Sequence, residues 1–260
     1  SVFQHYDSIT NLTINTTTKS IYNNNLYQLS NLKQIIISSS ITTIDDESFY
    51  NISKLQKIII PESVTTIGNN VFQGCSSLKE IKIPGSVTTI GNNVFYDCTS
   101  LRKVIIPPSV SSIGSNVFYN CSNIRDVECD PYKISLTSVF QHYDSITNLT
   151  INTTTKSINN NNLYQLSNLK QIIISSSITT IDDESFYNIS KLQKIIIPES
   201  VTTIGNNVFQ GCSSLKEIKI PGSVTTIGNN VFYDCTSLRK VIIPPSVSSI
   251  GSNVFYNCSN

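Results

Sequence analysis

The sequence predicts a β-rich solenoid in which one short strand from each coil adds to a parallel sheet. Three observations predict it. Core-type residues recur at intervals of 23, as at Ile44, Ile67 and Ile90. Each interval contains a short run of alternating apolar and polar residues, the pattern of a strand with one buried face. The interval repeats along nearly the whole chain, and a unit this small buries its apolar face only by stacking on its neighbours.

Residues 78–101 show how the front of one coil is predicted. Leu78, Ile81 and Ile83 form an L-x-x-I-x-I segment. Alternation along a strand sends the two isoleucines inward and Lys82 outward. Pro84 has no N–H for the ladder and ends the strand. The whole sequence contains eleven such segments, which begin at Ile9, Leu32, Leu55, Leu78, Leu101, Ile124, Ile146, Leu169, Leu192, Leu215 and Leu238.

The rest of the same unit returns the chain to the next strand. The β-branched run 87–90 predicts a second extended segment on the far side of the coil. The run 91–93, Gly-Asn-Asn, contains residues that tolerate positive φ and predicts a turn. Phe95, Cys98 and Leu101 then recur every three residues, which predicts a helical or 3₁₀ turn facing the core.

A tandem duplication organises the chain. Residues 1–123 recur as residues 138–260, and Tyr22 against Asn159 is the only difference. The unit between the two copies, 124–145, keeps the pattern of the 23-residue repeat but is one residue shorter. We therefore expect residues 1–260 to form a single continuous array. The run 130–133 is then a variant turn. Two arrays joined by a hinge at this turn remain the alternative.

The unit closely resembles the BspA-like leucine-rich repeat. The resemblance is carried by the run 78–84, by Ile90-Gly91, and by Phe95 and Cys98, and nearly every unit repeats it. It implies an α/β-type leucine-rich-repeat solenoid, with a parallel sheet of about eleven short strands on one face and short β and 3₁₀ or helical turns on the other. The chain departs from the family in having Val before the Phe, and its first units lack the Cys.

The resemblance also implies a function. Members of this surface antigen or adhesin type are often cell-surface or secreted proteins, and several bind extracellular matrix or host surface proteins. We therefore expect a non-enzymatic protein-binding module that is secreted or displayed on a cell. An intracellular protein-interaction scaffold is the alternative. The chain starts at Ser1 and contains no Met, so we expect any signal or anchor to lie outside it.

Composition argues against several other classes of function. Charged residues make up 13% of the chain and the net charge is +1, which gives no field to attract nucleic acid. Aliphatic runs are too short for membrane insertion. His5 and His142, the only histidines, are copies of one position without a positioned catalytic partner. The acidic run 45–47 lacks the spacing of a calcium loop. No catalytic residue, cofactor or metal site is predicted.

A partner is expected on the outward side of the strands. One outward ladder alternates in charge and includes Lys57, Glu80 and Lys103, an arrangement that supports register. The other is largely apolar, and an exposed apolar strip is a typical docking surface. It supplies the candidate partner-binding residues Ile36, Ile59, Lys82, Ile105, Ile173, Ile196, Lys219 and Ile242. A simple preference of isoleucine for strands is the other explanation of this ladder.

Four further features have structural explanations. Six cysteines, Cys75, Cys98, Cys121, Cys212, Cys235 and Cys258, share one inward position, and Cys129 replaces a strand residue, so we expect buried free thiols. A strip of Tyr27, Tyr50, Tyr96 and Tyr119 is interpreted as rim packing or an aromatic surface. Glycosylation sequons recur at Asn11, Asn15, Asn51 and Asn120 and at their copies. Neither end has a polar capping unit, which predicts end-to-end self-association.

Overall fold

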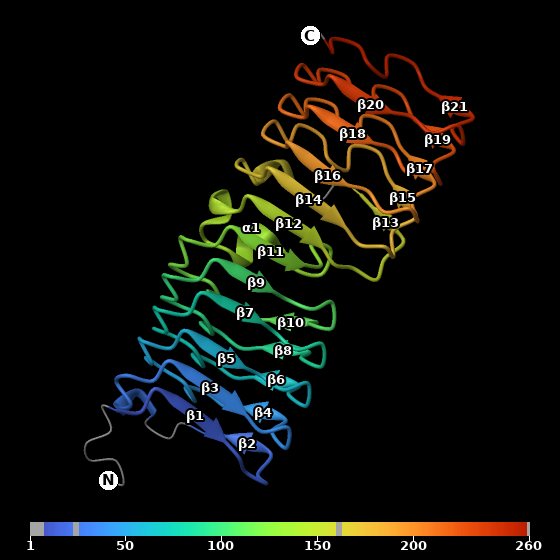
Figure 1. Ribbon diagram of the computed structural model, residues 1–260. Helices are drawn as coiled ribbons and strands as arrows, with labels where there is room; N and C mark the ends of the chain where they lie inside the picture. Colours follow the sequence, from blue (N-terminus) through green and yellow to red (C-terminus); the bar gives the residue numbers. More distant parts are fainter. Residues whose placement is uncertain (1–7, 23–25, 160–162, 259–260) are drawn as a thin grey trace. The chain divides into compact units, whose positions relative to one another are not determined.

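The computed structural model describes residues 8–22, 26–159 and 163–258 and divides into two compact units, 1–145 and 146–260. Each unit is a stack of coils with a front strand, a second strand and a run of turns (Figure 1). His5 lies outside the described residues. Because the chain forms two units, the continuity of one array through residues 124–145 remains a prediction.

The front strands are the L-x-x-I-x-I segments predicted above, and the described residues contain all eleven. In the first unit they are β1 (Asn11–Ile14), β3 (Gln34–Ile37), β5 (Lys57–Ile59), β7 (Glu80–Lys82), β9 (Lys103–Ile105) and β11 (Asp126–Cys129). In the second unit they are β12 (Asn148–Ile151), β14 (Gln171–Ile174), β16 (Lys194–Ile196), β18 (Glu217–Lys219) and β20 (Lys240–Ile242). Neighbouring strands that pair do so in parallel, each residue facing the one 23 positions later.

The front sheet is interrupted once within each unit. Strands β1, β3 and β5 form one hydrogen-bonded group, and β7, β9 and β11 belong to another. In the second unit β12, β14 and β16 pair with one another, and β18 pairs with β20. The interruption falls at the same place in both copies, so its cause lies in residues that the copies share. A ladder unbroken through each copy is what the sequence pattern alone predicts, and the structure corrects it.

The β-branched runs form the second strands. In the first unit these are β2 (Ser20–Ile21), β4 (Thr43–Ile44), β6 (Thr66–Ile67), β8 (Thr89–Ile90) and β10 (Ser112–Ile113). In the second they are β13 (Ser157–Ile158), β15 (Thr180–Ile181), β17 (Thr203–Ile204), β19 (Thr226–Ile227) and β21 (Ser249–Ile250). Each set is a five-stranded parallel sheet. A glycine after these strands stacks so closely on the coil before it that a Cβ on Gly91 would lie 2.6 Å from the Gly68 carbonyl oxygen.

The third side of most coils is a run of hydrogen-bonded turns. Alternate amides bond within the coil, as from Cys98 N to Phe95 O at 3.1 Å, or to the next coil, as from Phe95 N to Val117 O at 2.9 Å. Asn93, with φ of 54°, gives the left-handed turn that lets the pattern alternate. Regular 3₁₀ helix is found only at η1 (Leu26–Gln28), η2 (Tyr143–Ser145) and η3 (Leu163–Gln165) among the described residues.

The junction unit differs from the others on its far side. A short helix, α1 (Leu136–Val139), stands where the second strand would be, because the β-branched run is missing there. Phe140 nevertheless stacks on Phe118 with ring centroids 4.8 Å apart. Phe140 therefore keeps the core position of the repeat although the second strand is replaced.

The core is a set of vertical columns, one for each inward position of the unit. Phe49, Phe72, Phe95 and Phe118 stack at 5.2–5.5 Å between centroids with almost parallel rings, and each is at most 1% exposed. Leucine, isoleucine and valine columns flank them. None of the helices in the described part of the chain is long and apolar enough to span a membrane.

Candidate functional site

The eight outward residues named above form four pairs in register on the front strands. The pairs are Ile36 with Ile59, Lys82 with Ile105, Ile173 with Ile196, and Lys219 with Ile242. Exposed fractions are 44% for Ile59, 42% for Ile196 and 48% for Ile242, which makes them unusually open for isoleucine. The sheet interruption lies between the two pairs of each copy.

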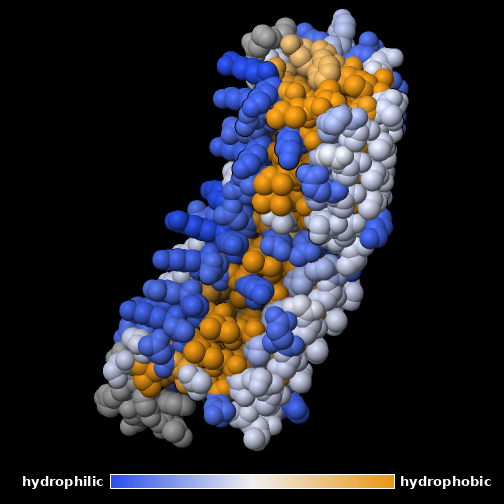
Figure 2. Space-filling model, turned by 45° about the vertical axis from the view of Figure 1, so that its right-hand side comes forward, coloured by the Kyte–Doolittle hydropathy of each residue, from blue (hydrophilic) through white to orange (hydrophobic). Residues whose placement is uncertain are grey.

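A groove opens on the front face at each interruption. Groove 1, in the first unit, has a volume of about 570 Å³ and crosses β5, β7 and β9. It is lined by Lys57, Ile58, Ile59, Ile60, Pro61, Glu62, Glu80, Ile81, Lys82, Pro84, Lys103 and Ile105. Groove 2, in the second unit, has a volume of about 670 Å³ and is lined by Gln193, Lys194, Ile195, Lys216, Glu217, Ile218, Lys219, Arg239, Lys240 and Ile242. Figure 2 shows hydrophobic residues in a strip flanked by hydrophilic side chains.

The parted strands uncover part of the core. Ile58 occupies an inward position of β5, where Ile35 of β3 is fully buried, yet Ile58 is only half-buried. Its copy Ile195 is 8% exposed, compared with 0% for Ile172 on the preceding strand. Each groove therefore has an isoleucine floor between outward-facing polar walls.

The structure brings together some of the predicted residues and separates others. Ile59, Lys82 and Ile105 line groove 1, and Lys219 and Ile242 line groove 2. The other three predicted residues, Ile36, Ile173 and Ile196, lie on the same faces outside the groove linings.

Cationic side chains line both grooves, in groove 1 as Lys57, Lys82 and Lys103 beside the carboxylates Glu62 and Glu80. The lining of groove 2 contains five of them and a single carboxylate, Glu217. The copies of these cations in the first unit are Lys57, Lys79, Lys82, Arg102 and Lys103, all exposed. Lys79 and Arg102 are not among the predicted binding residues, but their copies Lys216 and Arg239 line groove 2. No groove is predicted from the sequence; the signal that could have indicated its place is Lys82, which interrupts the isoleucine ladder.

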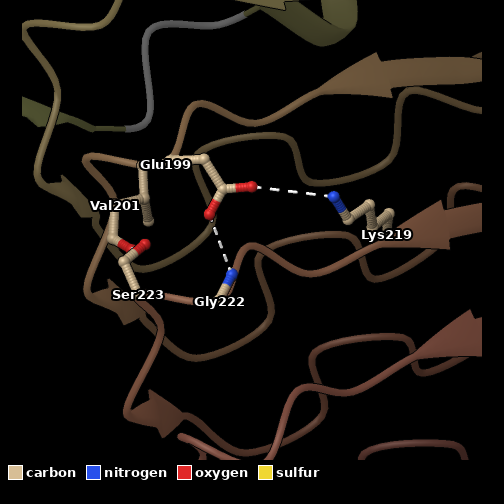
Figure 3. Close-up of polar contacts among 5 residues, drawn as sticks. All are labelled: Glu199, Val201, Lys219, Gly222 and Ser223. Carbon is tan, nitrogen blue, oxygen red and sulfur yellow. Dashed lines mark hydrogen bonds and ion pairs between the residues drawn. The ribbon is translucent and has the colours of Figure 1, made fainter.

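A glutamate from the turn after β16 supports one wall of groove 2 (Figure 3). Glu199 Oε2 accepts a hydrogen bond from Gly222 N at 3.0 Å, and Oε1 lies 3.7 Å from Lys219 Nζ. Ser223 Oγ, in the next residue, donates to the Val201 carbonyl oxygen at 2.5 Å. The corresponding backbone bond in groove 1, Gly85 N to Glu62 Oε2, is 2.9 Å long. Both side chains of the ion pair are exposed, so its contribution to stability is small.

The alternating outward charges take the predicted register but do not close into ion pairs. Glu80 lies directly opposite Lys103, and Glu217 opposite Lys240. Among the residues that the structure describes, neither pair comes within ion-pair distance. These lysines therefore keep their charge available at the groove.

The cysteines are part of the core, as predicted. Cys75, Cys98 and Cys121 are fully or almost fully buried, and each Sγ donates to a phenylalanine carbonyl of the preceding coil, at 3.3, 3.2 and 3.1 Å. Burial raises the pKa of Cys75 to about 12 because a thiolate loses its hydration there. Cys129 is also buried, while Cys258 in the last described coil is half-buried. The buried thiols are neutral and inaccessible, which is unsuited to nucleophilic chemistry.

The acidic run 45–47 serves as a turn. Asp46 Oδ1 accepts from Asn69 N at 2.7 Å, Asn69 Oδ1 accepts from Asn92 N at 2.8 Å, and Asn92 Oδ1 accepts from Ser115 N at 2.8 Å. Asp183, the copy of Asp46, accepts one hydrogen bond from the backbone N–H of Asn206 and one from its side-chain amide, and these bonds lower the pKa of its carboxyl. No group of three His, Cys, Asp or Glu residues able to hold a metal ion is found in the described ranges.

The tyrosines that follow the core phenylalanines form stacked pairs on the rim. Tyr96 and Tyr119 lie 4.7 Å apart between ring centroids, and Tyr233 and Tyr256 lie 4.9 Å apart. The side chain of Tyr27 lies outside the described residues. Stacking accounts for these tyrosines without a ligand.

The chain matches the family model of a BspA type leucine rich repeat region, with six copies, over residues 1–125 and 135–260. No curated protein matches it. A leucine-rich repeat protein from Bacteroides ovatus is 26% identical, with 97% of this chain and 77% of that chain covered and a TM-score of 0.44. A leucine rich cell surface protein from Faecalibacterium prausnitzii is 22% identical, with 96% and 86% covered and a TM-score of 0.42. The TLR13–ssRNA13 complex, at 13% identity, 84% and 36% coverage and a TM-score of 0.57, shares the fold.

Proposed function

The chain belongs to the BspA type leucine-rich repeat family, and we propose that it is a non-enzymatic protein-binding module, secreted or displayed on a cell surface, that adheres to a host or matrix protein. The contact is made through the front face of the sheets. The observation that carries this proposal is the outward row of exposed isoleucines beside a groove, present in both copies. Exposed aliphatic residues ringed by polar ones are typical of protein-binding surfaces.

The extracellular location is supported by the family resemblance and by the sequons. Asn51, Asn120, Asn188 and Asn257 each carry an N-x-S sequon and sit in left-handed turns with φ of 54–58°. All four are exposed, as an acceptor for a glycan must be. Their side chains lie on the turn side of the coil, so glycans there would leave the front face open.

The free thiols favour a second candidate, an intracellular scaffold with the same binding face. Seven cysteines are free, and free thiols are more typical of the reducing cytosol than of secreted proteins. Labelling intact source cells with a membrane-impermeant reagent separates the two locations. Labelled chain supports the surface role, whereas chain that reacts only after the cells are lysed supports the scaffold.

The binding face is tested by placing charge on it in both copies. We expect Ile59→Glu with Ile196→Glu to weaken binding to a captured matrix or host surface protein by at least about tenfold, because a buried unpaired carboxylate opposes docking. The control is Thr65→Glu with Thr202→Glu, which adds the same charge at exposed β-branched positions outside the front strands. Biolayer interferometry against a panel of such proteins measures the affinity, and circular dichroism checks folding. Equal affinity of the two variants would exclude the front face.

A further inference from the structure

The two grooves are electrostatically unlike the chain as a whole. The full sequence has 18 Lys and Arg against 17 Asp and Glu, which is close to balance. Groove 2 nevertheless has five cations and one carboxylate in its lining. Groove 1 is lined by three lysines, Lys57, Lys82 and Lys103, together with Glu62 and Glu80. The lining of groove 2 is therefore strongly cationic, and that of groove 1 has a smaller excess of positive charge.

In groove 2 the nearby carboxylates leave most of the positive charge uncompensated. Glu199 already accepts from a backbone amide and faces a single lysine, Lys219. Glu62 likewise accepts from Gly85 N. Lys57, Lys103 and their copies Lys194 and Lys240 have no ion-pair partner among the described residues.

The shape and floor of the grooves restrict what fits there. Each groove runs between neighbouring parallel strands, and its floor includes Ile58 and Ile81 in the first unit and Ile195 and Ile218 in the second. Isoleucine floors favour an aliphatic side chain, while the lysine walls favour carboxylates. A polyanion without apolar groups would interact with the lysine walls but would leave the isoleucine floor without an apolar contact.

We propose that each groove binds an extended acidic polypeptide segment that presents aliphatic side chains to the floor and carboxylates to the lysine walls. One chain then binds two such segments, one in each unit. This inference rests on the proposed function, of which it specifies the partner. A partner with several acidic segments would gain affinity from the second groove, because its second contact is intramolecular.

The test uses the full chain and a short fluorescent peptide in which leucines alternate with glutamates. We expect isothermal titration to give two peptides per chain and fluorescence anisotropy to show binding that weakens with salt. A peptide with lysine in place of glutamate is expected not to bind. Lys82→Glu and Lys219→Glu are each expected to weaken one of the two sites at least about tenfold, and the double variant to weaken both sites.

The matched control is Lys54→Glu with Lys191→Glu. These lysines are exposed, change the net charge equally, and donate to Asn31 Oδ1 and Asn168 Oδ1 on the turn side of the coil. An equal loss in the control would overturn the proposal, since it would show attraction to net charge alone. Absence of peptide binding, or full displacement of the peptide by an oligonucleotide or by anionic vesicles, would also overturn it.

The result also separates this inference from the proposed function. If the acidic peptide does not bind while the Ile59→Glu with Ile196→Glu variant still loses a protein partner, the acidic specificity is wrong and the binding face stands. If both fail, the front face does not bind proteins.

Discussion

Single residues in this chain are constrained chiefly by the coils above and below them. Each cysteine of the repeated inward position donates its Sγ proton to a carbonyl 26 residues earlier, as Cys75 and Cys98 do, and Asn69 accepts from the amide 23 residues later. Such contacts repeat because neighbouring coils place equivalent atoms side by side. A substitution at one of these positions therefore changes the contacts with both neighbouring coils. We expect substitutions at the repeated positions to lower stability most.

Buried thiols predict that stability falls in alkali. Below the pKa of an unfolded cysteine, about 8.5, the thiol is protonated in both the folded and the unfolded chain. Its burial then contributes fully to the free energy of unfolding. Between that value and the folded pKa, about 12 for Cys75 and Cys212, only the unfolded state loses it. The free energy of unfolding then falls by up to about 1.4 kcal/mol per pH unit for each thiol.

The measurement is urea unfolding under reducing conditions across this pH range. A Cys75→Ala with Cys212→Ala variant keeps every tyrosine and is expected to show a shallower decline than the unchanged chain. Declines of equal slope would contradict the raised pKa values of these two thiols.

At the scale of the element, stacking rather than intrinsic propensity stabilises the coils. The second strands contain only two residues each, far too few to persist alone. The phenylalanine columns connect the coils, and rings in the middle of a column have a neighbour on both sides. Phe95 lies 5.2 Å from the rings of both Phe72 and Phe118.

Position in the column predicts the cost of removing a ring. Phe95→Ala is expected to lower the free energy of unfolding by about 3–5 kcal/mol, because it leaves a cavity in a closed core. Phe255→Ala is expected to cost about 1 kcal/mol or less, since Phe255 is 43% exposed and stacks on Phe232 alone in the described structure. Chemical denaturation of the two variants gives the comparison. Similar losses of unfolding free energy in the two variants would show that ring stacking within the columns does not stabilise the fold.

At the scale of the molecule, duplication gives two compact units with equivalent grooves. The last described coil in the second unit has an open apolar side: Ile250 is 51% exposed, whereas Ile227 on the preceding second strand is 1% exposed. An uncovered strand edge beside exposed apolar residues favours pairing with another chain.

We therefore predict that the 260-residue chain self-associates as its concentration rises. Ile250→Lys is expected to suppress the association, because it places a charge on the uncovered side. Thr202→Lys, an exposed β-branched position within the stack, is the matched control and is expected to associate like the unchanged chain. Multi-angle light scattering over a concentration series measures the mass. A constant monomer mass for the unchanged chain would contradict the prediction.

The sequence alone determined the repeating unit, the eleven front strands, the inward columns of Phe and Cys, and the outward placement of Ile59 and Lys82. These follow from local alternation and the 23-residue period, which specify what each side chain faces. Only the tertiary structure decided where the front sheet parts and that Lys216 and Arg239 line a groove. Those features depend on how neighbouring coils fit together. The spacing between two coils is a collective result of packing, and no residue pattern within one coil encodes it.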